Sequence, residues 1–224
     1  MTLHLEDFLI TGRTFEEYCA FFNLDIHALQ GKKVLDCPSG VSSFVAKANA
    51  HNIHAQGCDL IYQFDSADIQ RQARDSIEKI YKDTSWMHDH NWSFYGSLEG
   101  HKHHRQQALE SFINAYDPSL YRYEQLPLLS YDDNSFDLLL SSHLLFVYDD
   151  RLDLTFHLES IAQMLRVAKE VRIFPLIDFK NSRKDKRDNL SPFVKTVLQK
   201  FNAHLSPVNF EFQPGGGTMM TISQ

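Results

Sequence analysis

Residues 33–42 have the sequence KVLDCPSGVS, and this stretch decides how the rest of the chain is interpreted. A short apolar run ends at Asp36, and a Pro-Ser-Gly turn follows directly. Short apolar runs between turn signals are typical of strands that are buried on both faces of a parallel sheet. Serines at the end of the turn can cap a helix over 42–50. The stretch therefore predicts the strand, turn and helix that open an α/β fold.

Similar patterns recur along the chain. We expect strands over 53–59, 136–142 and 171–174, helices over 65–80, 154–168 and 191–201, and a final hairpin with strands over 208–212 and 219–222. The helices are predicted from apolar positions three or four residues apart. Strands that alternate with helices predict a mostly parallel, doubly wound sheet that is covered on both faces. The closing hairpin adds an antiparallel strand.

The segment 84–118 is longer than a connection between two strands requires. Residues 84–104 show no helical period, and we expect a loop or irregular cap there, followed by a short helix over 109–116 that Pro118 ends. The segment contains both tryptophans, and disordered segments are poor in aromatic residues. We therefore expect an ordered cap over a binding pocket.

Composition limits the partners and the location. The chain has 224 residues, a formal net charge of -7 and a pI near 5.9, so nucleic acid is a disfavoured partner. The basic run 180–187 is interrupted by aspartates and is expected to be a solvated loop. An odd number of cysteines, three, and the absence of a long apolar stretch predict a cytoplasmic protein without a membrane span. Nothing in the sequence indicates the oligomeric state.

Several runs resemble the class I S-adenosylmethionine-dependent methyltransferases. The turn after Asp36 is similar to their D/E-x-G-x-G-x-G turn, and Asp59 ends the second strand as an acid does in that family. The block LPLLSYDDNSFD at 126–137 resembles their LPF-x-D-x-S-FD run, and MLRV at 164–167 resembles their E-x-x-RVL helix ending. More narrowly, GRTFEEY, LDCPSGVSSF, SSHLLFVY, EVRIFPL and FEFQPGGG look like a group of bacterial methyltransferase-like proteins whose substrate is unassigned.

The resemblance implies one Rossmann-like domain over 1–224 with a seven-stranded sheet, an N-terminal helical segment over 1–30 and the inserted cap 84–118. It implies S-adenosyl-L-methionine as the cofactor and a small molecule as the methyl acceptor. By resemblance, the cofactor would be bound by Arg13, Tyr18, Asp36, Pro38, Ser39, Gly40, Ser42, Asp59, Leu60, Glu124, Gln125, Leu126, Ser142 and His143. Asp59 would accept hydrogen bonds from both ribose hydroxyls.

The chain also departs from the family pattern. Pro38 and Ser42 replace two of the three family glycines, and Arg122 stands where relatives have the acid that holds the adenine amine. Glu124 or the backbone would then bind adenine. Because glycines are lost, a non-catalytic module with the same fold is an alternative. A nicotinamide-dependent oxidoreductase is disfavoured because it needs the G-x-G-x-x-G turn, and a nucleic-acid methyltransferase because the N/D-P-P-Y/F tetrapeptide is absent.

Each candidate site residue has a structural alternative. His143 follows a strand at the end where α/β sites form, so it can contact cofactor or take a substrate proton, or simply satisfy its own turn. Asp36 can bind the cofactor or the turn's own backbone. Trp92 and Arg105 are candidates for contact with the acceptor, Arg105 with an anionic group, although a surface arginine is the simpler expectation. The histidines at 88, 90, 101, 103 and 104 match no zinc-site spacing, and a solvated loop is expected.

Overall fold

The computed structural model describes residues 8–177 and 190–224. Within these residues, seven strands form one sheet in the order β3-β2-β1-β4-β5-β7-β6. The strands are β1 (Lys33–Asp36), β2 (His54–Asp59), β3 (Tyr121–Tyr123), β4 (Phe136–Ser142), β5 (Ala168–Phe174), β6 (Ala203–Pro207) and β7 (Thr218–Ser223). β1 to β5 pair in parallel, whereas β7 is antiparallel to β5 and β6. The expected Rossmann-like sheet with a C-terminal antiparallel hairpin is confirmed.

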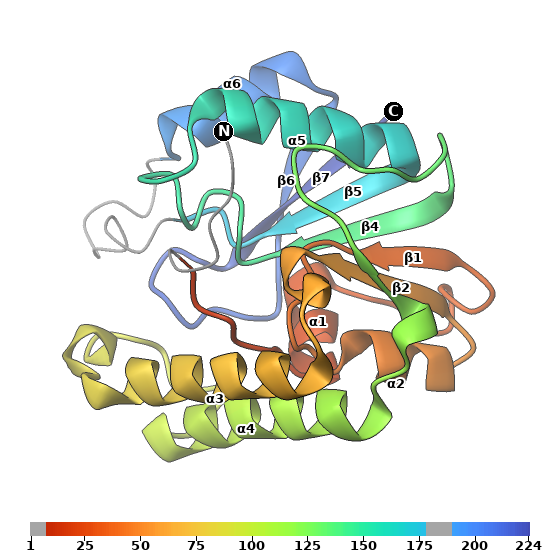
Figure 1. Ribbon diagram of the computed structural model, residues 1–224. Helices are drawn as coiled ribbons and strands as arrows, with labels where there is room; N and C mark the ends of the chain where they lie inside the picture. Colours follow the sequence, from red (N-terminus) through yellow and green to blue (C-terminus); the bar gives the residue numbers. More distant parts are fainter. Residues whose placement is uncertain (1–7, 178–189) are drawn as a thin grey trace.

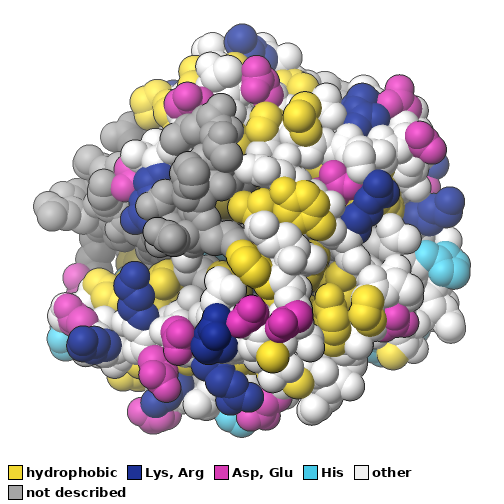
Figure 2. Space-filling view, in the orientation of Figure 1, with side chains coloured by type: hydrophobic (Ala, Val, Ile, Leu, Met, Phe, Trp, Pro, Cys, Tyr) yellow, Lys and Arg dark blue, Asp and Glu magenta, His cyan; other side chains and the backbone are white. Residues whose placement is uncertain are grey.

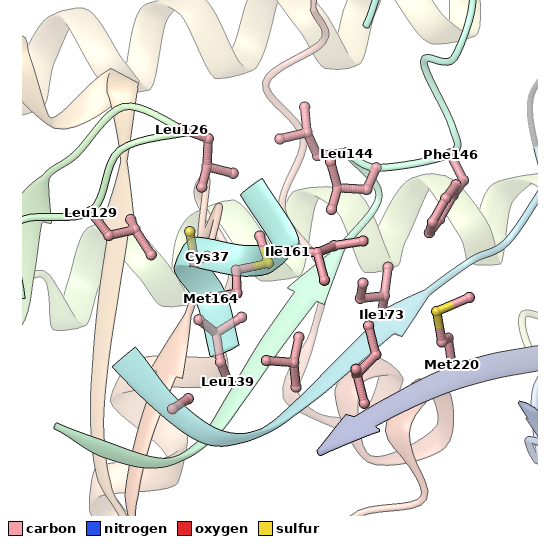
Figure 3. Packing of buried hydrophobic residues seen from close by; sticks show 14 of the residues in the cluster. Cys37, Leu126, Leu129, Leu139, Leu144, Phe146, Ile161, Met164, Ile173 and Met220 are labelled. Carbon is pink, nitrogen blue, oxygen red and sulfur yellow. The ribbon is translucent and has the colours of Figure 1, made fainter. Parts of the chain in front are cut away.

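Helices cover both faces of this sheet (Figure 1). One face carries α5 (Leu154–Val167) and α6 (Pro192–Lys200), and the other carries α1 (Phe15–Phe22), α2 (Phe44–Ala50), α3 (Ser66–Lys82) and α4 (Leu98–Ala115). Each face has its own buried apolar cluster. On the α5 face, Leu139 and Ile173 of the sheet lie in one cluster with Ile161 and Met164 of α5 (Figure 3). Two layers of helices thus bury both faces of the parallel strands, as their apolar sequences require.

The end of α5 also positions the loop that precedes β4. Arg166, in the last turn of α5, donates hydrogen bonds to the carbonyl oxygens of Leu129 (2.6 Å) and Tyr131 (2.8 Å) and pairs with Asp133 at 2.7 Å. A guanidinium can satisfy several acceptors at once because its donors lie in a fixed plane. The arginine of the MLRV run therefore fixes the loop that leads from β3 to β4.

Three sequence expectations need correction. α4 begins at Leu98, so residues 98–104 are helical and not part of a loop. Its buried face includes His101, Arg105, Ala108 and Phe112, and two polar members of that face hide the apolar period on which the prediction relied. β5 begins three residues earlier than expected, at Ala168. The hairpin strand is β6 over Ala203–Pro207, whereas residues 208–212 lie in the connection to β7.

Two of the expected segments lie partly or wholly outside the described residues. The N-terminal helical segment 1–30 contains α1, and its first seven residues lie outside the described part, as does the basic run 180–187. Short 3-10 helices occur at Leu60–Gln63 (η2), Ser85–Met87 (η3) and Pro118–Leu120 (η4). None of the described helices is both long enough and apolar enough to span a bilayer. On the face seen in Figure 2, acidic and basic side chains are interspersed, with hydrophobic side chains toward the middle.

Candidate functional site

A cavity of about 510 Å³ lies where β1, β2 and β4 end. Its wall includes Pro38 after β1, Asp59 at the end of β2 and His143 after β4. Open α/β sheets bind their ligands beyond the carboxyl ends of the strands. The volume is within the range of about 300–1,000 Å³ that small-molecule sites have. The cavity is therefore the candidate functional site.

The turn after β1 forms one wall of the cavity. Gly40 has a φ of 55°, a left-handed conformation that glycine adopts without steric cost. Its N–H donates to Asp59 Oδ2 at 2.8 Å, and its carbonyl oxygen accepts a hydrogen bond from the Tyr62 hydroxyl at 2.6 Å. The single glycine retained from the family pattern is therefore at the position where the backbone conformation requires one.

Asp59 connects this turn to the next segment. Its Oδ1 accepts a hydrogen bond from the Ile61 N–H at 3.0 Å, so each carboxylate oxygen receives one backbone bond. Burial raises the pKa of Asp59, and the N–H groups of Ile61 and Gly40 partly offset this rise. A carboxylate oxygen has two lone pairs, so each oxygen can accept a further hydrogen bond from a ligand hydroxyl. Asp59 is fixed in place and lines the cavity.

Asp36 lies behind the turn and is fully buried. Its carboxylate accepts hydrogen bonds from the Tyr18 hydroxyl (2.9 and 3.0 Å), the Ser39 hydroxyl (2.8 Å) and the Ser42 hydroxyl (3.1 Å). Burial raises the pKa of Asp36 to about 7 against the effect of these donors. The carboxylate therefore organises the turn and α1, and the ligand would meet Tyr18, Ser39 and Ser42, which line the cavity.

The loop between β3 and β4 supplies an apolar wall with one acid. Leu126 and Leu129 are buried and line the cavity near Cys37 (Figure 3). Glu124 also lines it, and its oxygens accept hydrogen bonds from the Ser130 N–H (3.0 Å) and hydroxyl (2.5 Å). Arg122 pairs with Glu124 at 3.0 Å. The arginine that departs from the resembled pattern therefore pairs with the acid two positions later, and Leu126 and Leu129 form an apolar slot, the part of the wall beside Glu124.

His143 occupies the wall beyond β4. It has a φ of 57°, and its Nδ1 lies 2.7 Å from the Ser142 hydroxyl. Its ring packs against Phe21 at 5.2 Å and Phe174 at 5.8 Å between centroids. Burial and the nearby Arg13 hold the pKa of His143 well below its usual value. Nε2 has no hydrogen-bond partner among the described residues, and the imidazole, kept neutral by its low pKa, lines the cavity.

The opposite wall comes from the cap segment and from the connection between β6 and β7. Trp86, Tyr95 and His101 line the cavity together with Phe210 and Phe212. His101 stacks on Phe212 with centroids 4.7 Å apart and an interplanar angle of 13°. Burial and Arg105 lower the pKa of His101 to about 2. This wall is thus a continuous aromatic surface built from two segments far apart in the sequence.

The aromatic wall corrects the expectation of a solvated histidine loop. His90 and His101 are buried, and the His90 ring lies 4.6 Å from the Phe212 ring. Trp92 is half-buried, packs edge-on against Phe212 and does not line the cavity, whereas Trp86 does. Residues 208–212 were expected to form a strand. They lie instead in the connection to β7, and Phe212 of this connection packs against both His90 and His101.

A buried ion pair joins the cap to α1. Arg105 pairs with Glu17, and its Nη1 donates to the Gly12 carbonyl oxygen at 2.7 Å. Glu17 also accepts hydrogen bonds from the Tyr95 hydroxyl (2.5 Å) and from the Thr14 N–H (2.7 Å). Burial alone would raise the pKa of Glu17, but Arg105 and Arg13 lower it overall. Arg105 therefore is not a surface arginine, and its charge is already balanced.

Most of the predicted cofactor-binding residues line this one cavity. They are Arg13, Tyr18, Pro38, Ser39, Gly40, Ser42, Asp59, Leu60, Glu124, Leu126, Ser142 and His143. Asp36 and Gln125 do not line it, and Arg105 does. The sequence prediction omitted the cavity residues Tyr95, His101, Phe210 and Phe212. Phe210 and Phe212 were expected in a hairpin strand and Tyr95 in the cap, and only the fold brings them together around one cavity.

Comparison with known proteins gives one relative by sequence. No family model matches the chain. It is 30% identical over 224 residues to the uncharacterized protein MJ0045 of Methanocaldococcus jannaschii, with 98% of each chain covered. This relative is archaeal, so the expected bacterial grouping is not confirmed.

The solved structures that the chain matches have low sequence identity and low TM-scores. One is the PH0226 protein of Pyrococcus horikoshii, at 12% identity and a TM-score of 0.45, covering 93% of this chain and 86% of that one. Another is a SAM-dependent methyltransferase of Aquifex aeolicus, at 13% identity and a TM-score of 0.36, covering 91% of this chain and 88% of that one.

Proposed function

The chain belongs to the same family as the archaeal protein MJ0045, and we propose that it binds S-adenosylmethionine and transfers the methyl group to a small acceptor. One observation carries the proposal. The Gly40 turn, the Asp59 carboxylate and the apolar slot of Leu126 and Leu129 come from three separate connections and line one cavity. A turn, an acid and a slot in this arrangement suit a methionine chain, a ribose and an adenine in that order.

The residues present fit the cofactor. Each oxygen of Asp59 accepts one backbone hydrogen bond and can accept another from a ribose hydroxyl. Burial raises the pKa of Asp59, and hydrogen bonds from two hydroxyls would stabilise its charged form. Glu124, already paired with Arg122, leaves the slot without an unbalanced charge against a neutral adenine. The Pro38 side chain in the turn is compatible with a ligand that has no pyrophosphate.

S-adenosylmethionine would supply a methyl group bonded to a sulfonium sulfur: an acceptor atom would bond to the methyl carbon as the carbon–sulfur bond breaks, and the neutral thioether would leave. The chain's own task is to hold the reacting atoms in line and to exclude water. The aromatic wall of Tyr95, His101, Phe210 and Phe212 encloses the cavity opposite the turn. His143 lines the cavity and its Nδ1 lies 2.7 Å from the Ser142 hydroxyl, so in this proposal its Nε2 would take the proton that the acceptor atom releases.

The test is titration calorimetry with S-adenosylhomocysteine. We expect micromolar affinity, and we expect both Asp59→Ala and Asp59→Asn to weaken binding by about 1.5–3 kcal/mol, because hydrogen bonds to a charged acceptor are lost. Asp59→Asn retains one oxygen acceptor, so its loss should be the smaller of the two. Asp68→Asn is the matched control, since Asp68 lies on α3 and pairs with exposed Arg71.

NAD and NADP are the opposing ligands, and a thermal-shift assay tests their binding. The turn lacks the glycines that let a backbone approach a pyrophosphate, so millimolar dinucleotide should not raise the melting temperature. Binding of S-adenosylhomocysteine that is the same in folded Asp59 variants and in the wild-type protein would refute the ribose assignment. A clear stabilisation by NAD would favour an oxidoreductase instead.

A further inference from the structure

The connection between β6 and β7 forms a fixed part of the cavity wall. Phe210 and Phe212 of this connection line the cavity. The Asn91 N–H, in the cap segment, donates to the Phe212 carbonyl oxygen at 2.8 Å. Within the connection, a carboxylate oxygen of Glu211 accepts a hydrogen bond from the Gly215 N–H at 2.6 Å. The connection is therefore tied both to the cap and to itself.

A third attachment of the connection depends on a glycine. Gly216 also lines the cavity, and a Cβ there would lie 2.9 Å from Ile177 Cδ1 and 3.0 Å from the Gln213 carbonyl oxygen. Because this position has no side chain, Ile177 packs directly against the connection. A surface that is already ordered loses less conformational entropy on binding than a mobile one. The rings of Phe210 and Phe212 thus stand on a backbone that the protein itself holds in place.

The aromatic wall carries no net charge of its own. The Tyr95 hydroxyl donates to Glu17 at 2.5 Å, and His101 Nδ1 lies 2.6 Å from the Tyr81 hydroxyl. His101 is neutral because burial and Arg105 lower its pKa to about 2. The charge of Arg105 is balanced by Glu17. The wall therefore offers a ligand ring surfaces and not charges.

The rings of the wall contact one another in the geometries that attract aromatic rings. Phe212 lies 5.1 Å from Tyr95 with the planes at 87°, and 4.7 Å from His101 with the planes at 13°. Phe210 lies 4.6 Å from Phe21 with the planes at 75°. Edge-to-face and stacked pairs of this kind gain energy beyond the area that they bury. A further aromatic ring in the cavity would gain the same attraction, whereas a saturated ring would gain the burial alone.

We propose that the methyl acceptor carries an aromatic ring that packs against this wall, in the part of the cavity opposite the Gly40 turn. The inference rests on the proposed function, because the turn side of the cavity is assigned there to S-adenosylmethionine. Trp86 also lines the cavity and is 45% exposed, so its ring lies at the mouth through which the acceptor would enter.

The first measurement compares two amides that differ only in the saturation of their ring. The protein is saturated with S-adenosylhomocysteine and titrated with benzamide or with cyclohexanecarboxamide, and the NMR signals of the protein report binding. Benzamide should bind about three- to ten-fold more tightly, which is the effect of one or two ring–ring contacts. Equal affinities, tighter binding of the saturated amide, or no binding of benzamide up to its solubility limit would overturn the proposal.

The two tryptophans of the chain show where the amide binds. Trp86 lines the cavity and Trp92 does not. Trp86→Phe and Trp92→Phe assign the two indole N–H signals. Benzamide should shift the Trp86 signal through its ring current, cyclohexanecarboxamide should shift it much less, and the Trp92 signal should move little in either titration. A larger shift at Trp92 would place the amide outside the cavity and contradict the proposal.

Phe212→Leu tests the wall directly. Leucine keeps an apolar side chain but removes the ring, so the preference for benzamide should fall below about two-fold, whereas Phe212→Tyr should retain it. Phe64→Leu is the matched control, because Phe64 is exposed and does not line the cavity. Thermal unfolding confirms the fold of each variant, and Trp86→Leu replaces Phe212→Leu if the latter is unstable. An unchanged preference in the variant of the wall would refute the assignment.

The affinity for S-adenosylhomocysteine separates this inference from the proposed function. Calorimetry should give the same affinity for the wild-type protein and for Phe212→Leu. A loss in Phe212→Leu as large as the loss for benzamide would assign the wall to the cofactor and overturn the inference. Failure of S-adenosylhomocysteine to bind the wild-type protein would instead refute the proposed function, and the two amides titrated without it would still test the aromatic site.

Discussion

At the scale of single residues, a buried acid supports the turn and leaves the contact with the ligand to its neighbours. Asp36 has the position of the family's strand-end acid, yet its oxygens are occupied by Tyr18, Ser39 and Ser42. Its role is to order three hydroxyl groups around the turn. The sequence left open whether Asp36 serves the ligand or the turn, and these contacts favour the turn. The direct ligand contact stays a prediction.

The pKa of Asp36 leads to a pH prediction. The folded protein holds this carboxyl with a pKa of about 7, above its ordinary value, because the group is buried. Between about pH 4 and 7 the folded state therefore binds more protons than the unfolded state, so this group makes stability fall as pH rises through that window. The slope is up to about 1.4 kcal/mol per pH unit. Above pH 7 its contribution no longer changes.

Asp36→Asn removes this titration and provides the measurement. Urea unfolding at several pH values should show the variant gaining stability relative to the wild-type protein as pH rises from 4 to 7. The carboxyl carbon of Asp36 should titrate near pH 7 by NMR. A constant difference between the two proteins across this range, with a midpoint near 4, would contradict the assignment.

At the scale of elements, α1 and α4 are joined by charge as well as by apolar packing. Glu17 and Arg105 are fully buried and paired, and Tyr95 and Thr14 satisfy the remaining capacity of Glu17. The capping box of Thr14 and Glu17 also begins α1, so the same acid serves a helix start and a helix contact. Tyr18, the next residue, binds Asp36, and α1 thereby connects the cap to the turn.

This pair predicts a non-additive pattern of stability. Arg105→Leu leaves Glu17 charged and buried without its partner and should destabilise the protein by about 3–5 kcal/mol. Adding Glu17→Gln removes that charge while keeping an acceptor for Tyr95 and Thr14, so the double variant should recover a large part of the loss. Urea unfolding of the two single variants and the double variant measures the coupling. If the losses of unfolding free energy in the two single variants simply add up to the loss in the double variant, Glu17 and Arg105 contribute by packing alone.

At the scale of the whole molecule, the cavity is assembled from segments that are distant in the chain. The turn 38–42, the η2 region 59–63 and the loop 124–129 would meet the cofactor, and the segment 85–97 would meet the acceptor. These segments follow different strands, so a ligand in the cavity orders them together. A ligand confined to the cofactor part should leave the cap largely unaffected.

Hydrogen exchange measured by mass spectrometry tests this division. Saturating S-adenosylhomocysteine should slow amide exchange by about ten-fold or more in 38–42, 59–63 and 124–129, since a ligand that binds the folded state suppresses local opening there. The cap residues 85–97 should change little. Protection strongest in the cap, or restricted to one of the three segments, would show that the cofactor and acceptor parts are assigned incorrectly.

The sequence by itself determined the helices and strands whose apolar residues follow a single pattern, either a continuous run or a helical spacing. The apolar runs of β1 and β4, and the spacing of apolar residues in α3 and α5, each specify one conformation because propensity and pattern agree. The strand-end acids and the turn could then be expected at one place, because a parallel sheet brings the carboxyl ends of its strands to one edge. Most of the residues expected at the cofactor were for this reason found around one cavity.

Only the tertiary structure decided the opposite wall and the charges. The inward face of α4 carries His101 and Arg105, which look like solvent-exposed residues until Phe212 and Glu17 are placed against them. These contacts join residues whose separation in sequence leaves no periodic pattern. A polar side chain is stable in a core only when a specific partner satisfies it. Because that partner is chosen by the fold, the sequence predicted the strand-end residues and a cap over the pocket, but not the stacking of His101 on Phe212 or the buried pair of Arg105 and Glu17.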